Sequence, residues 1–271
     1  MSSVFDRYKE LKIERRGNGV TMITLNRPQV LNAMTYTMHA ELAQVWNDID
    51  RDPETRVAVV TGAGRAFCAG NDLKNPDPDF DGVRDIMRDA IAIVRGMIEC
   101  DKPIISAING VAVGAGLAVA ILADISIAAE DAKLIDGHTK VGVVAGDHAC
   151  VIWPLLCGMA KAKYYLWNVE PLTGRVADDL GIVTKALPLE EVLPHALQLA
   201  DQLAAMAQPA IRGTKRALNG WLRQAMPIFE HSAALETVDF FGPDVHAART
   251  AFREKREVVF PSARNATLAA E

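Results

Sequence analysis

Apolar and polar residues alternate with two different periods along the first 190 or so residues of this chain. Short runs rich in β-branched residues predict strands at residues 19–27, 57–64, 103–109 and 125–130. Between them, residues 35–50 and 81–99 carry apolar side chains on one helical face, and Thr35 stands where it would cap the first helix. Strands alternating with helices are typical of parallel pairing, so the pattern predicts an α/β fold.

The strand pattern ends near residue 189. Amphipathic segments follow at residues 189–207, 210–226, 228–241 and 244–260, with prolines 209, 227 and 243 at the breaks. We therefore divide the chain into a core, residues 1–205, and a C-terminal all-helical region, residues 206–271.

Composition narrows the class of protein. The chain has 271 residues, half of them hydrophobic, which is enough for one sizeable domain. Its net charge is −5 with acids and bases interspersed, so nucleic-acid binding is not expected. The four cysteines form no CxxC pair, so we expect reduced thiols and no metal site. The first ten residues are polar, so we expect no signal peptide and a cytoplasmic location.

Residues 103–123 carry no charge and are long enough to suggest a membrane helix. Asn109-Gly110 interrupts the run and Asp124 ends it, so we expect no membrane insertion. Glycines 110, 114 and 116 fit neither a P-loop nor a dinucleotide-binding motif. What remains is a strand, a turn and a helix beginning near Ala115, whose N-terminal amides either face a ligand or merely allow tight packing.

Residues 57–73 repeat this arrangement, because a strand runs into the glycine-rich turn before Asn71. The amide of Asn71, just after Gly70, would be free to donate a hydrogen bond. Two such amides from separate turns make an oxyanion hole, in which each donor is worth about 3 kcal/mol.

Four segments together resemble the crotonase family, also called the enoyl-CoA hydratase/isomerase family. They are TLNRPQVLNAM (24–34), GRAFCAGNDL (64–73), the longer stretch 102–134 and AFREKREVVF (251–260). The resemblance covers nearly the whole chain. It implies a core spiral of ββα turns, a C-terminal helical oligomerisation region that packs homotrimers or hexamers, and a coenzyme A thioester as substrate with no separate cofactor.

The resemblance also implies roles for particular residues. The thioester carbonyl would be held by the amides of Asn71 and Ala115. Residues expected at the substrate are Arg27, Ala66, Cys68, Ala69, Gly70, Asp72, Leu73, Lys74, Gly114, Gly116 and Ala118. Among these, Arg27 and Lys74, with Lys255 and Arg256, are candidates for the CoA phosphates, and Asp72 is more suited to fixing the turn.

The sequence departs from the family pattern at two positions. Typical hydratases carry two catalytic glutamates, and the matching positions here are Ala118 and His138. Addition of water needs a positioned acid and base, so we expect His138 to move protons with Asp147 as its partner. Asp136 and His148 flank this pair. A histidine base of ordinary pKa, about 6–7, predicts an acidic limb in the pH–rate profile.

Three functions follow from these residues. The first is an enzyme acting on an acyl-CoA through a stabilised enolate. The second is a hydrolase that cleaves a carbon–carbon bond of a β-dicarbonyl compound, a branch of the superfamily that residues 136–156 also resemble. The third is a catalytically weak acyl-CoA-binding protein that kept only the oxyanion hole.

Overall fold

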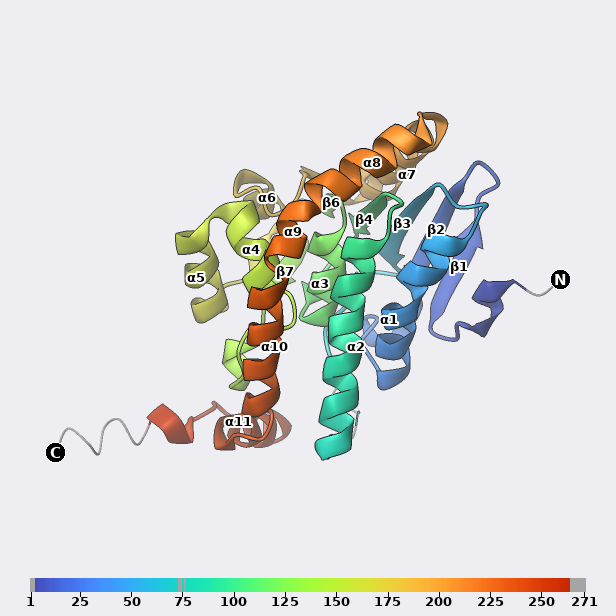
Figure 1. Ribbon diagram of the computed structural model, residues 1–271. Coiled ribbons are helices and arrows are strands. Elements are labelled where there is room, and N and C mark those ends of the chain that lie inside the picture. The colour runs from blue at the N-terminus through green and yellow to red at the C-terminus, as the bar shows by residue number, and fades with distance from the viewer. Residues whose placement is uncertain (1–2, 73–74, 76, 264–271) are drawn as a thin grey trace.

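Two β-sheets organise the computed structural model, which describes residues 3–72, 75 and 77–263 (Figure 1). The larger sheet has the order β1 (Leu11–Arg15), β2 (Val20–Leu25), β3 (Val57–Gly62), β4 (Ile104–Ile108), β6 (Ile125–Ala129) and β9 (Lys185–Leu187). Only the β1–β2 pair is antiparallel; the others are parallel. The smaller sheet contains β5 (Ala112–Val113), β7 (Lys133–Ile135) and β8 (Leu172–Thr173).

Helices connect the strands and then form the C-terminal part of the chain. They are α1 (Tyr36–Arg51), α2 (Phe80–Glu99), α3 (Ala115–Leu122), α4 (Ala149–Cys157), α5 (Met159–Asn168), α6 (Gly174–Asp179), α7 (Leu189–Ala205), α8 (Gln208–Leu218), α9 (Gly220–Gln224), α10 (Met226–Asp239) and α11 (Pro243–Arg253). α1 and α2 pack side by side, and α7 lies against β3, β4 and β6. α10 packs on α2 and α4, which brings the C-terminal helices back to the core (Figure 1).

The predicted α/β fold with a C-terminal helical region is confirmed. All four predicted strands and both early helices are present, and the Thr35 side chain accepts a hydrogen bond from the amide of Met38. Helix α7 ends at Ala205, and the division of the chain into two regions at that residue stays a prediction. Among the described residues after 189, every regular element is a helix.

Two expectations differ from the structure. The sequence pattern did not indicate β1, which has five residues, nor β5, β7, β8 and β9, which are only two or three residues long. The helix predicted over 244–260 ends at Arg253, because Lys255 adopts a left-handed backbone with φ of 52° and the Arg256 amide turns back to the carbonyl of Ala251. The helix that the family resemblance implies for residues 251–260 is therefore wrong for the residues after Arg253.

The uncharged run 103–123 is divided between β4, β5 and α3. Over the described ranges, none of the helices has the length and apolar character that crossing a membrane requires.

Candidate active site

Short backbone pairings bring the two glycine-rich turns together. Cys68 and Ala112 form a parallel bridge, with the amide of Val113 donating to the carbonyl of Cys68 at 2.9 Å. A second bridge joins Met34 to Asn71. The first turn is thus held between the start of α1 and β5, which leads directly into the second turn.

The two predicted donor amides are free among the described residues. Neither the amide of Asn71 nor that of Ala115 has a hydrogen-bond partner there. Ala115 is the first residue of α3, so its amide lies at the positive end of the helix dipole. A Cβ built on the preceding Gly114, whose φ is 53°, would meet nothing within 4 Å. Space is therefore open beside Gly114, the residue that precedes this donor.

Gly116 sets the distance between the two turns. A Cβ at this position would lie 2.4 Å from Cβ and 2.7 Å from Sγ of Cys68, which is too close for any side chain. Cys68 is fully buried, and burial raises the pKa of its thiol to about 11. It therefore acts as a packing residue between the turns and is poorly suited to nucleophilic chemistry.

An ion pair between Arg27 and Asp72 stabilises the first glycine-rich turn. A guanidinium nitrogen of Arg27 lies 2.9 Å from a carboxylate oxygen of Asp72, and Arg27 also donates to the carbonyl of Ala33 and pairs with Glu10 at 3.4 Å. The Arg27 side chain is only 17% exposed. Its charge is thus engaged within the protein, beside the turn that it holds.

The remaining predicted substrate residues have differing surroundings. Ala66 and Ala118 are buried, and Ala118 belongs to the main apolar core. The amide of Ala69 donates to the carbonyl of Leu31, and Gly70 has a φ of 87°. Leu73 and Lys74 lie outside the described residues. Lys255 and Arg256 are exposed, with Arg256 pairing with Glu254.

His138 enters the site next to the second turn. The amide of Gly114 donates to the carbonyl of Ile135, the last residue of β7, at 3.3 Å. Because β5 and β7 are parallel, the segments that follow them emerge at the same edge of the small sheet. Asp136 and His138 therefore begin beside Gly114 and Ala115.

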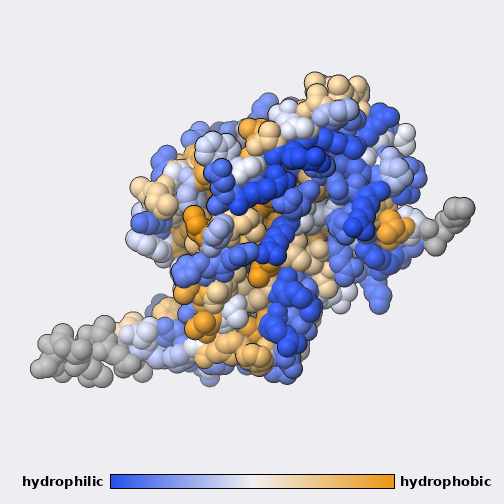
Figure 2. All heavy atoms as spheres, in the orientation of Figure 1, coloured by the Kyte–Doolittle hydropathy of each residue, from blue (hydrophilic) through white to orange (hydrophobic). Residues whose placement is uncertain are grey.

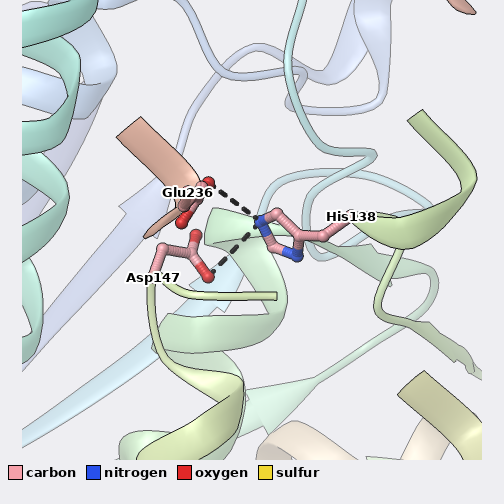
Figure 3. A group of neighbouring side chains, drawn as sticks. All are labelled: His138, Asp147 and Glu236. Carbon is pink, nitrogen blue, oxygen red and sulfur yellow. Dashed lines mark ion pairs between the residues drawn. The ribbon is translucent and has the colours of Figure 1, made fainter. Parts of the chain in front are cut away.

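A charged cluster surrounds the His138 ring (Figure 3). Its Nδ1 is 2.9 Å from Asp136, while its Nε2 is 3.4 Å from Asp147 and 3.6 Å from Glu236. His148 places Nδ1 2.5 Å from Asp147 and Nε2 3.7 Å from Asp136. The structure thus brings together His138 with the predicted partner Asp147 and with both flanking residues.

Glu236 is the member that sequence reasoning missed. It lies on α10, nearly 90 residues after Asp147, and its side chain points at His138 from the helical region (Figure 3). Glu236 is 3% exposed, which is unusual for a carboxylate. The only sequence signal is its position in HSAALETVD, where small and apolar neighbours indicate a buried face.

The cluster holds protons at neutral pH. Burial raises the pKa of Glu236 to about 8, with Asp147 and Asp136 adding to the increase and His138 opposing it. Burial alone would lower the pKa of His138, but Asp136, Asp147 and Glu236 outweigh it and raise that pKa well above the ordinary value. Burial would raise the pKa of Asp147, yet the two histidines hold it well below its usual range.

These directions correct one expectation. A histidine pKa of about 6–7 is wrong for His138, because three carboxylates stabilise its cation. At neutral pH the ring is protonated, Asp147 is ionised and Glu236 is neutral. The cluster thus contains a proton donor and a proton acceptor in contact. The ligand atoms of His138, Asp147 and Glu236 also lie within 4.8 Å of one another, which is close enough for the three residues to hold a metal ion.

Comparison with known proteins agrees with this architecture. The family model described as enoyl-CoA hydratase/isomerase matches residues 15–263. A probable peroxisomal enoyl-CoA hydratase 1 of Arabidopsis thaliana is 33% identical, over 79% of this chain and 80% of its own. The 1,2-epoxyphenylacetyl-CoA isomerase of Escherichia coli K12 is 34% identical, over 74% of this chain and 79% of its own. The crystal structure of an enoyl-CoA hydratase/isomerase from Mycobacterium paratuberculosis is 35% identical and superposes with a TM-score of 0.82, covering 89% of this chain and 97% of that one.

Proposed function

The chain belongs to the enoyl-CoA hydratase/isomerase family, and from this premise we propose that it is an enzyme that transfers protons at the carbon atoms next to an acyl-CoA thioester. One observation carries the proposal. Two unpartnered backbone amides, of Asn71 and Ala115, lie on turns joined through β5, and the paired strand β7 delivers His138 beside them.

The two amides would hold the thioester carbonyl oxygen. When a proton leaves the α-carbon, or a nucleophile adds to the β-carbon, negative charge moves onto that oxygen as an enolate. Preorganised donors stabilise this charge without having to reorient, at about 3 kcal/mol each. The open space beside Gly114, the residue before Ala115, supports this role.

The charged cluster would handle the protons. In addition of water to an enoyl thioester, the ionised carboxylate of Asp147 would accept the proton that water loses. The Nε2–H of His138 would supply the proton that the α-carbon gains. Asp136 receives Nδ1–H of His138 and so keeps Nε2 directed toward Asp147 and Glu236.

A panel of acyl-CoAs tests this function directly. Purified protein would be incubated with 2-enoyl-CoAs and 3-enoyl-CoAs of increasing length, and products identified by mass spectrometry and chiral chromatography. Gain of one water indicates hydration, and a changed retention time at constant mass indicates isomerisation. Binding of every acyl-CoA without turnover of any would contradict the proposal and favour the acyl-CoA-binding alternative.

The cluster gives specific support to the second function, hydrolysis of a β-dicarbonyl carbon–carbon bond. Position 118 is an alanine within the apolar core, so α3 supplies no acid, and the site depends on a histidine with several carboxylates. Such a group suits activation of water for attack on a ketone, with the released carbanion held as an enolate in the oxyanion hole. Cyclic 1,3-diketones without CoA belong in the same panel, and cleavage would appear as a keto acid heavier by one water.

A homotrimer, or a hexamer of paired trimers, is part of this proposal. Hydrophobic residues gather on the surface over the lower part of α10 and over α11 (Figure 2). Val238 and Phe252 are 68% and 58% exposed there, and Trp221 on α9 is 68% exposed. Such apolar surface normally marks an interface. Light scattering should give a mass that is a multiple of three chains, and a stable monomer at micromolar concentration would contradict it.

A further inference from the structure

Three side chains of the charged cluster have the composition of a metal site. His138, Asp147 and Glu236 come from the β7 exit, the segment before α4, and α10. Both carboxylates are directed at the same ring nitrogen of His138 (Figure 3). One imidazole and two carboxylates are a donor set that suits zinc and related divalent ions.

The distances between the ligand atoms fit a single ion. Nε2 of His138 is 3.4 Å from Oδ1 of Asp147 and 3.6 Å from Oε1 of Glu236. Tetrahedral ligands at about 2.0–2.2 Å from a zinc ion lie about 3.3–3.6 Å from one another. An ion bonded to Nε2 would therefore reach both carboxylates with only small movements of their side chains.

The residues behind these ligands hold them as the outer residues of a metal site do. Nδ1 of His138 lies 2.9 Å from Asp136, which leaves Nε2 for the ion. The Asp147 carboxylate is held by Nδ1 of His148 at 2.5 Å. Metal-binding histidines almost always direct their other ring nitrogen at a carboxylate, carbonyl or water, and ligating carboxylates are themselves hydrogen-bonded.

Glu236 independently indicates a ligand. It is 3% exposed, and its Oε2 is buried without a hydrogen-bond partner among the described residues. The 3.6 Å between its Oε1 and His138 is longer than a hydrogen bond. Buried polar atoms normally have a partner that offsets the loss of water, and a cation would be one for this carboxylate. The side chains of His138 and Asp147 remain 11% and 9% exposed, so the cluster is not closed to solvent.

We propose that His138, Asp147 and Glu236 bind one zinc ion, with a fourth position left for water. Metal ligands must be deprotonated, so the ion would displace one proton from Nε2 of His138 and one from Glu236. Two positive charges enter and two protons leave to solvent, so the net charge of the cluster is unchanged. The inference does not depend on the proposed acyl-CoA function, but the zinc-bound protein would lack the Nε2–H that this function uses.

Metal titration tests the site without any substrate. Protein freed of metal by dialysis against a chelator would be titrated with zinc by calorimetry, and the loaded, dialysed protein analysed for metal content. We expect one zinc ion per chain. Cobalt should give the intense visible absorption of a four-coordinate ion without the near-ultraviolet band of a sulfur ligand. Absence of binding would overturn the inference, and so would a sulfur band, because the ion would then be held by a cysteine.

Three variants assign the ion to these residues. Asp136→Asn changes only the residue behind His138 and should weaken zinc binding about 10–100-fold, the usual cost of an outer partner. Glu236→Gln removes a charged ligand and should weaken it more. Glu230→Gln changes an exposed carboxylate of the same helix, paired with Arg95, and should keep the wild-type affinity. Unchanged zinc affinity in Glu236→Gln, in protein with a native circular dichroism spectrum, would overturn the inference.

Activity gives a separate comparison. Any acyl-CoA turnover found with the metal-free protein should fall when zinc saturates the site, because the coordinated Nε2 has no proton to donate. Unchanged turnover at saturating zinc would place the ion elsewhere and overturn the assignment. If the metal-free protein turns over no acyl-CoA, the proposed function fails, while the zinc titrations still decide this inference.

Discussion

The candidate site has two halves that are built in different ways. The half at Asn71 and Ala115 consists of backbone amides, fixed by glycines and by short strand bridges. The half at His138 consists of side chains, gathered from the β7 exit, the segment before α4, and α10. The first is insensitive to most side-chain changes at its donors. The second depends on the charges of its side chains, so replacing a charged member changes the charge around His138.

In the proposed mechanism the two halves have different tasks. Stabilisation of an enolate needs only two amides in the right places. The kind of reaction depends on which proton donors and acceptors stand around it. In the proposed mechanism, alanine at position 118 and histidine at position 138 leave all of that chemistry to one cluster, to which α10 adds Glu236.

Removal of His138 should have the largest effect on the side-chain half. In His138→Gln the central proton donor is lost, and kcat for the true substrate should fall by about 10²–10⁴-fold, the usual contribution of a general acid or base. His148→Gln is the matched comparison, because His148 contacts Asp147 and Asp136 but is fully buried. We expect a smaller loss there. Equal losses in steady-state kinetics would mean that His138 has no special role.

The backbone half should respond to a change at Gly116 instead. In Gly116→Val the new side chain would collide with Cys68 and displace one turn, so kcat should fall by about 10²–10³-fold, the cost of losing one oxyanion donor. Gly213→Ala, where a Cβ meets nothing within 4 Å, is the control and should keep full activity. Adding Cys68→Gly to Gly116→Ala should restore part of the rate. Wild-type kinetics in a folded Gly116→Val protein would refute the oxyanion assignment.

The two halves also differ in how well the sequence predicts them. The backbone half is local: a strand followed by Gly70-Asn71, or by Gly114-Ala115, indicates a free amide within a few residues. His138 and Asp147 are nine residues apart and could be paired by position. Glu236 could not, because its approach depends on how α10 packs on α4 and α2. The short strands β5 and β7, too brief to leave a period in the sequence, decide that His138 stands beside Ala115.

The pH dependence of Glu236 sharpens the comparison further. Because its pKa is about 8, ionisation above that pH adds a negative charge beside His138 and the developing enolate, so wild-type kcat should decline through about pH 8. Glu236→Gln should lack this limb. In the unfolded chain Glu236 loses its proton near its ordinary pKa of 4.5, whereas in the folded protein it keeps the proton up to its pKa of about 8. The contribution of Glu236 to the free energy of unfolding therefore becomes less favourable as the pH rises from 4.5 to 8.

Thermal unfolding measures this pH-dependent effect of Glu236 on stability without relying on activity. The Tm of Glu236→Gln relative to the wild type should therefore increase as pH rises through that window. A constant difference between pH 5 and pH 9 would show that Glu236 is not held neutral by the fold. Glu230→Gln, on the exposed side of the same helix, serves as the control.

We expect the smallest effect on activity from a change in the Arg27–Asp72 ion pair, which stabilises the first glycine-rich turn. Asp72→Asn removes one charge of the Arg27–Asp72 pair, whose atoms are 2.9 Å apart and largely shielded from water. Loss of a hydrogen bond between charged groups costs about 1.5–3 kcal/mol, but Glu10 and the carbonyl of Ala33 still hold Arg27. We expect Tm to fall and kcat/KM to drop only about threefold to tenfold, mainly through KM, because the turn loosens while the His138 cluster keeps its charge. The pH–rate profile should keep its limb near pH 8. If Asp72→Asn moves that limb, the two halves are coupled electrostatically and the division between them fails.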